Sequence, residues 1–63
     1  MKDIKMIYFT EFCKTTIQFS NEDNYKNKRE HYISLANADN AKKCVVEFIN
    51  EDGDYTRQII FEK

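Results

Sequence analysis

Residues 37–55 read N-A-D-N-A-K-K-C-V-V-E-F-I-N-E-D-G-D-Y, and the fold depends on how this stretch divides into elements. Its apolar residues recur at three- and four-residue spacing, so at about 100° per residue they share one arc of a helix. Asn37 is a suitable N-cap residue, and Gly53 can end a helix in the left-handed conformation. The pattern therefore predicts a helix over residues 37–51.

A strand over residues 44–49 is the alternative division of this stretch. Its two adjacent valines are β-branched, and it would pair with residues 55–61 across the turn E-D-G-D. Against this strand, Glu47 would share a face of the sheet with the apolar Val45 and Ile49. The helix is the preferred interpretation.

The two ends of the chain predict strands. Residues 4–12, I-K-M-I-Y-F-T-E-F, are apolar on both faces, which is typical of a central strand. Residues 15–20, T-T-I-Q-F-S, alternate with Ile17 and Phe19 inward and complete an N-terminal hairpin. Residues 55–62, Y-T-R-Q-I-I-F-E, predict the final strand.

The middle of the chain allows two interpretations. Residues 21–27 are polar and rich in asparagine, which suits a loop, and residues 29–35 then form a third strand. The alternative is a helix over residues 21–36, because Ser20 followed by Asp23 fits a capping box. The strand is preferred. The predicted fold class is α+β, a small antiparallel sheet of three to four strands with one amphipathic helix packed on one face, in the order ββ(β)αβ.

The composition limits the class of protein. The 63 residues make one domain, 1–63, and 41% of them are hydrophobic, which is too apolar for intrinsic disorder. Ten Lys and Arg against eleven Asp and Glu give a net charge of −1, which argues against nucleic-acid binding by bulk charge. Asp3 and Lys5 interrupt any signal core, so we expect a cytoplasmic protein with no membrane association. Cys13 and Cys44 are then expected to be reduced thiols that fill the core.

Metal and catalytic sites are not predicted. With Gly53 at the sixth position of an EF-hand loop, the first and twelfth positions would be Phe48 and Ile59, which cannot bind calcium. Two cysteines and one histidine without a C-x-x-C pair do not make a zinc site. No local pattern marks an activated nucleophile, and a single glycine cannot form a phosphate-binding loop. We expect no metal, no cofactor and no enzymatic activity.

An acidic surface is the first candidate for partner binding. Glu51, Asp52 and Asp54 surround the glycine, and Glu22 and Asp23 form a second cluster. In the predicted helix, the first two of these acids would lie at the negative end of the helix dipole, at a cost of roughly a few tenths of a kcal/mol each. Acids retained at such a cost indicate use by a partner.

An apolar surface is the second candidate. If the helix covers one face of the sheet, a set of apolar side chains points away from it, and such a set fits self-association as a homodimer or a partner contact. These residues are Ile7, Phe9, Tyr32 and Ile60.

A basic and aromatic segment is the third candidate. Residues 25–32 interleave tyrosines with basic side chains, as base stacking and phosphate contacts would require. Lys26, Lys28 and Arg29 would make the nucleic-acid contacts. Glu30 interrupts the segment, so a small nucleic-acid-binding protein is the alternative rather than the first hypothesis.

The acidic stretches S-N-E-D (20–23) and N-E-D-G-D (50–54), set on a strand-and-helix scaffold, carry a resemblance. In size, composition and general plan, the chain is similar to the small proteins that phages and other mobile elements encode to block host machinery, anti-CRISPR proteins among them. The resemblance includes no motif that matches residue by residue. It implies a stoichiometric inhibitor in the host cytoplasm, whose acidic surface occupies a basic nucleic-acid groove of a host protein such as a Cas nuclease.

Overall fold

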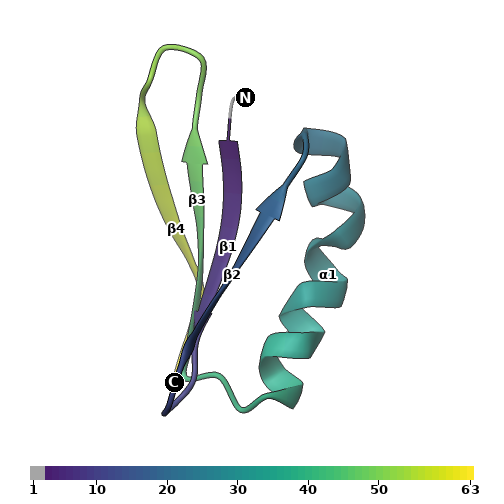
Figure 1. Cartoon of the computed structure of the whole chain (residues 1–63), viewed down its shortest axis with the longest axis vertical. Helices are drawn as coiled ribbons and strands as arrows, with labels where there is room; N and C mark the ends of the chain where they lie inside the picture. The colour runs from purple at the N-terminus through teal and green to yellow at the C-terminus, as the bar shows by residue number, and fades with distance from the viewer. Residues whose placement is uncertain (1–2) are drawn as a thin grey trace.

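Five elements follow one another in the computed structural model, which describes residues 3–63: β1 (Asp3–Phe9), β2 (Lys14–Phe19), α1 (Glu22–Ala38), β3 (Lys43–Ile49) and β4 (Tyr55–Glu62). The strands form one antiparallel sheet in the order β2-β1-β3-β4, and α1 packs on one face of it, over β2 and β1 (Figure 1). The predicted fold class, an antiparallel sheet with one helix, is confirmed. The order of elements is ββαββ, so the helix comes before the third strand rather than after it.

The N-terminal hairpin forms as predicted, and β1 is central. Met6 lies between Ile17 of β2 and Val46 of β3 and is fully buried. Alternation places Ile4, Met6 and Tyr8 on the face that α1 covers, where all three belong to the core. A strand that is apolar on both faces needs neighbours on both sides, because only a central position buries both sets of side chains.

Residues 29–35 belong to α1, so the prediction of a third strand there is wrong. The helix starts after Asn21, whose side-chain oxygen accepts a hydrogen bond from the Asn24 amide at 2.7 Å. The alternative helix over residues 21–36 was close to correct, although its N-cap is Asn21 rather than Ser20. Only a narrow stripe of the helix is apolar, with Tyr25 and Ala36 buried, and this is why the polar sequence resembled a loop.

Residues 37–40, predicted to start a helix, instead end one. Asn40 has a φ of 61°, the left-handed conformation that asparagine tolerates better than most residues. The Ala41 amide donates to the Ala36 carbonyl at 2.9 Å, and the Asn40 amide donates to the Asn37 carbonyl at 3.1 Å. These two bonds form a Schellman motif, and both alanines are fully buried. Asparagine suits both ends of a helix, so the sequence alone did not distinguish them.

Residues 43–49 form β3, so the prediction of a helix over residues 37–51 is wrong. Cys44, Val46 and Phe48 pack toward α1, while Val45 lies on the opposite face and is also fully buried. A central strand with apolar side chains on both faces contains the same three- and four-residue spacings as an amphipathic helix. The Glu47 that counted against a strand pairs with Lys5 on one side and Arg57 on the other.

An aromatic cluster joins α1 to the sheet. The Tyr25 ring meets Phe19 and Phe48 edge to face, with centroids 5.2 and 5.6 Å apart, and Tyr32 meets Phe19 at 5.6 Å. Each such pair contributes about 0.5–1.5 kcal/mol beyond the area it buries. In a domain of this size, large rings supply much of the thin core.

The sheet face opposite α1 has no helix over it, and its apolar residues differ from those predicted. Ile7 and Phe9 lie there as expected, but Tyr32 is on α1 and Ile60 packs against the helix-side core, so these two assignments are wrong. The apolar row across this face is Ile7, Val45 and Ile59. Ile7 and Val45 are buried by their neighbours, while Ile59 is 53% exposed on the edge strand β4. The strongly exposed apolar side chains of this face are therefore on β4, where Tyr55 is 57% exposed as well.

Candidate functional site: an acidic end of the molecule

The acidic stretch around Gly53 is the tip of the β3–β4 hairpin. The Asn50 amide donates to the Asp54 carbonyl at 3.1 Å, and the Gly53 amide donates to the Asn50 carbonyl at 2.9 Å. Gly53 has a φ of 85°, as in a three-residue hairpin loop with glycine in the left-handed position. The prediction that Gly53 ends a helix is wrong, and it is the hairpin alternative that the structure adopts.

Because residues 50–54 connect two strands, the energetic cost expected from a helix dipole does not apply to the hairpin acids. Glu51 and Asp52 lie in a hairpin loop, so no helix terminus opposes their charge. Glu22 and Asp23 lie in the first turn of α1, where the positive end of the dipole stabilises carboxylates. A local structural role thus explains the α1 acids, whereas no ion pair within residues 3–63 accounts for the acids of the hairpin.

The fold brings these two acidic clusters to the same end of the molecule. The first turn of α1 and the β3–β4 loop lie at the same end of the long axis, although about thirty residues separate them in sequence (Figure 1). We call this the acidic end, and it consists of Glu22, Asp23, Glu51, Asp52 and Asp54. It holds five of the eleven acids in a chain whose net charge is only −1. Nearly half of the acids therefore lie at one end of the molecule.

Most carboxylates of the acidic end carry no intramolecular ion pair. Lys26 lies 3.6 Å from Glu22, one helical turn away, and both side chains are exposed. Within residues 3–63, no salt bridge involves Asp23, Glu51, Asp52 or Asp54. All five acids are exposed, so this end can approach a positively charged surface with only the exposed Glu22–Lys26 contact to exchange among the ion pairs of residues 3–63.

The basic segment on α1 does not form the surface expected for nucleic-acid contact. Lys26 and Lys28 differ by about 200° around the helix, so they point to different sides. Arg29 is engaged within the molecule, since its Nε donates to the Tyr25 hydroxyl at 3.2 Å and its guanidinium lies 3.0 Å from Glu30. Tyr25 is buried and Tyr32 half-buried, so the rings expected to stack on bases pack in the core instead.

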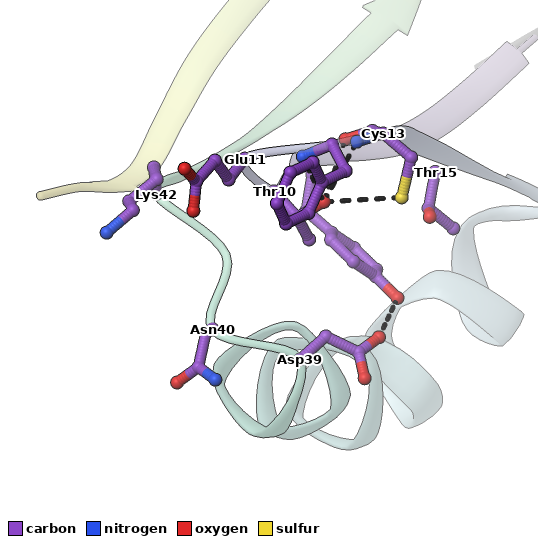
Figure 2. A pocket seen from close by; sticks show the side chains of 9 residues that line it. Thr10, Glu11, Cys13, Thr15, Asp39, Asn40 and Lys42 are labelled. Atoms are coloured by element: carbon purple, nitrogen blue, oxygen red, sulfur yellow. Dashed lines mark hydrogen bonds between the residues drawn. The ribbon is translucent and has the colours of Figure 1, made fainter.

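A hollow of about 560 Å³, which no sequence pattern indicated, lies at the opposite end of the molecule. The β1–β2 loop and the connection from α1 to β3 line it, together with Tyr8, and Figure 2 shows Thr10, Glu11 and Cys13 on one side of the hollow and Asp39 and Asn40 on the other. The Tyr8 hydroxyl donates to Asp39 at 2.5 Å, and this bond ties the end of α1 to β1. The same hydrogen bond raises the pKa of Tyr8.

The hollow also exposes Cys13, whose sulfur lies 3.2 Å from the Thr10 hydroxyl. The prediction that Cys13 fills the core is wrong, whereas Cys44 is fully buried as predicted, and burial raises its pKa. Both cysteines are free thiols. His31, the single histidine, is not among the residues that line the hollow. Titratable side chains among the residues that line the hollow with Cys13 are Tyr8, Glu11, Asp39 and Lys42.

Across the described part of the chain, no group of three or more His, Cys, Asp or Glu side chains is placed to hold a metal ion. No helix in residues 3–63 has the length and apolar character needed to cross a membrane. Comparisons with protein-family models, with curated proteins and with solved structures found no match to this chain.

Proposed function

We propose that this protein is a non-enzymatic, protein-binding inhibitor of host machinery. Its acidic end would occupy a basic, nucleic-acid-binding groove of a host protein, for which a Cas nuclease is the first candidate. The observation that supports this proposal is the gathering of five exposed carboxylates from two distant segments at one end of a chain that is nearly neutral overall (Figure 1).

The physical basis is electrostatic mimicry of a nucleic acid. A groove that binds phosphates carries Lys and Arg side chains, and a cluster of carboxylates meets the same side chains. Complementary charge speeds encounter and sets the orientation of the two proteins. The chain supplies these carboxylates without a large net charge, because its ten basic residues nearly balance its eleven acids, and Lys26 is the basic residue that pairs with one of the five, Glu22, among residues 3–63.

A charge-matched pair of variants tests this proposal. One variant neutralises the hairpin acids (Glu51→Gln, Asp52→Asn and Asp54→Asn), and the other neutralises three exposed acids elsewhere (Glu11→Gln, Glu30→Gln and Glu62→Gln). Both change the net charge by the same amount, so only the position of the charges differs. Each protein is immobilised and used to capture proteins from bacterial lysate, with and without nuclease treatment, and the captured proteins are identified by mass spectrometry.

The wild type and the second variant are expected to retain the same host protein, and the hairpin variant is expected to lose it. Purified Cas nucleases are then assayed for guide-directed DNA cleavage with each variant added. Equal capture by the two variants would contradict a role for the hairpin acids. Capture that disappears after nuclease treatment would favour nucleic-acid binding, and a third variant, Lys26→Gln with Lys28→Gln and Arg29→Gln, would then be expected to lose it.

A further inference from the structure

The outer side of β4 is an unpaired strand edge. β4 pairs with β3 on one side only, and its first five residues, Tyr55–Ile59, are all exposed. The chain contains no proline that would block pairing, and Tyr55 and Ile59 are 57% and 53% exposed. The other edge strand, β2, is shorter and has α1 packed against it (Figure 1). β4 is therefore the edge open to another strand.

The hydrogen bonds of the hairpin show which backbone groups of β4 face this edge. Asn50 and Asp54 form a hydrogen-bonded pair at the tip. In an antiparallel ladder, hydrogen-bonded pairs alternate with pairs whose amides and carbonyls point away from the partner strand. Counting from the tip, the backbone groups of Tyr55, Arg57 and Ile59 point outward. A register shift beside Val45, opposite Ile60, interrupts the regular ladder after them.

We propose that β4 pairs antiparallel with β4 of a second copy of this chain, about a two-fold axis at Arg57. In this register Tyr55 faces Ile59 of the second copy, Arg57 faces its own counterpart, and Ile59 faces Tyr55. All three outward-pointing residues then find hydrogen-bonding partners. The two four-stranded sheets become one sheet of eight strands.

A second copy fits this edge for reasons of symmetry and charge. The three outward-pointing residues are arranged symmetrically about Arg57, and the pairing places an aromatic ring against a β-branched side chain on the open face twice. Antiparallel pairing also sets the acidic hairpin of each copy toward the end of the other where β3 begins and β4 ends, which carries Lys42, Lys43 and Lys63. At that end Lys43 is paired with Glu62 at 3.3 Å and Lys63 donates to Asn37 at 3.1 Å. Lys42 remains for the hairpin acids, as does Lys63 once it exchanges the neutral Asn37 for a carboxylate.

One contact opposes the pairing and makes the register testable. Two arginines would meet at the axis, and like charges directly opposite each other are unfavourable. Glu47, which lies across from Arg57 on β3, partly offsets this repulsion in each copy. Replacing Arg57 with a neutral residue is therefore expected to strengthen the dimer, which no interface away from the axis predicts.

Cross-linking through a single introduced cysteine tests the register. The background is Cys13→Ser, because Cys13 is exposed, while Cys44 is fully buried and inaccessible. At a hydrogen-bonded antiparallel pair the Cα atoms lie about 5.5 Å apart, a distance that a disulfide spans. Arg57→Cys is expected to form a covalent dimer under mild oxidation. Thr16→Cys, exposed at the middle of the other edge strand β2, serves as the control and is expected to stay monomeric.

Sedimentation of the purified protein over a range of concentrations provides the second measurement. The wild type is expected to be in concentration-dependent equilibrium between one and two copies. Ile59→Lys is expected to raise the dissociation constant by about tenfold or more, because a charged side chain on an edge blocks pairing. Arg57→Gln is expected to lower it. Circular dichroism verifies that each variant is folded.

Three outcomes would overturn the proposal: a wild type that stays monomeric at all concentrations, cross-linking of Thr16→Cys in place of Arg57→Cys, or a dimer that Ile59→Lys leaves unchanged. The proposal does not depend on the proposed function, because every measurement uses the purified protein without a host partner. The α1 part of the acidic end also lies on the far side of the sheet from β4 (Figure 1).

Discussion

The two β-hairpins of this protein consist of similar strands but differ in how much of their surface is buried. β1–β2 lies under α1, and its loop is held by local bonds, since the Cys13 amide donates to the Thr10 hydroxyl at 3.0 Å and the Thr10 amide donates to the Cys13 carbonyl at 2.8 Å. β3–β4 shares one buried strand with the core but leaves β4 almost wholly exposed and carries the acids at its tip. The first hairpin and β3 supply the buried core, whereas β4 and the tip of the second hairpin present an exposed surface.

The largest expected difference between the hairpins is in the cost of removing an apolar side chain. Met6→Ala in β1 empties a fully buried site and is expected to lower the free energy of unfolding by about 2–5 kcal/mol. Chains of this length are stable by only about 3–9 kcal/mol in total, so this variant is expected to lose most of its cooperative transition. Ile59→Ala in β4, by contrast, is expected to cost less than about 1 kcal/mol, because the side chain is 53% exposed.

Urea unfolding followed by circular dichroism, at a protein concentration low enough to avoid self-association, measures both values. Met6→Leu is the control for Met6→Ala, since it conserves volume and is expected to cost less than about 1.5 kcal/mol. Similar losses for Met6→Ala and Ile59→Ala would show that both hairpins contribute equally to the core and would remove the contrast.

The stability of the second hairpin's tip depends on the backbone conformation of Gly53 rather than on side-chain packing. A Cβ added at Gly53 would have nothing within 4 Å, so Gly53→Ala creates no clash with neighbouring residues. The φ of 85° nevertheless disfavours any residue with a side chain, and we expect a loss of about 1–2 kcal/mol. Gly53→Asn is expected to cost less, because asparagine tolerates this conformation better. Thermal unfolding measures the difference, and equal stability of all three proteins would mean that the turn adopts another conformation.

The sequence predicted the first half of this fold and its second half with different success. The first hairpin and the last strand followed from period-two alternation, and the two-sided apolar pattern of residues 4–12 correctly indicated a central strand. Residues 44–49 share this two-sided pattern, and in the structure they form a central strand as well. The helical arc was preferred because spacings of three and four occur in both structures, and only the partner strands decide between them.

The helix and the acidic end were hard to predict for a related reason. α1 buries only two residues fully, so tertiary contacts of Tyr25 and Ala36, rather than a strong amphipathic pattern, hold it in place. The acids themselves were identified from the sequence, but no local pattern places residues 22 and 23 at the same end of the molecule as residues 51–54 (Figure 1). That shared end is a property of the chain topology. The sequence did contain one unused signal for the hairpin, because asparagine three residues before a glycine is typical of a tight turn.

The Tyr8–Asp39 hydrogen bond joins the first hairpin to the end of the helix, and the second hairpin has no counterpart of it. Tyr8→Phe removes the bond while keeping the ring, and it is expected to lower the free energy of unfolding by about 1 kcal/mol. Asp39→Asn, which keeps an acceptor oxygen but removes the charge, is expected to cost less. Urea unfolding at neutral pH measures both, and no change in Tyr8→Phe would mean that water replaces the bond without loss.

The same bond predicts a pH dependence. Because it raises the pKa of Tyr8 above the ordinary value of 10.0, its contribution is complete below pH 10 and is lost as the pH rises through the folded-state pKa. Tyr55, which donates to Glu47 at 2.6 Å, has its pKa raised in the same direction, so Tyr55→Phe is the necessary comparison. Stability measured from about pH 8 to pH 11 is expected to fall less steeply in either variant than in the wild type. A wild-type profile that rises over this range would contradict the assigned direction.

The smallest expected changes in the free energy of unfolding are for substitutions at the two hairpin tips. These changes show whether either tip contributes to the stability of the fold. Phe12 at the first tip is 91% exposed, and Glu51, Asp52 and Asp54 at the second are exposed and without ion pairs among the residues described here. Phe12→Ser and the neutralised hairpin variant are each expected to change stability by less than about 0.5 kcal/mol. If the acids are present for a partner, the second variant loses that partner at unchanged stability. A clear loss of stability on neutralisation would instead give these acids a role in folding, and their exposure would then no longer support a binding surface.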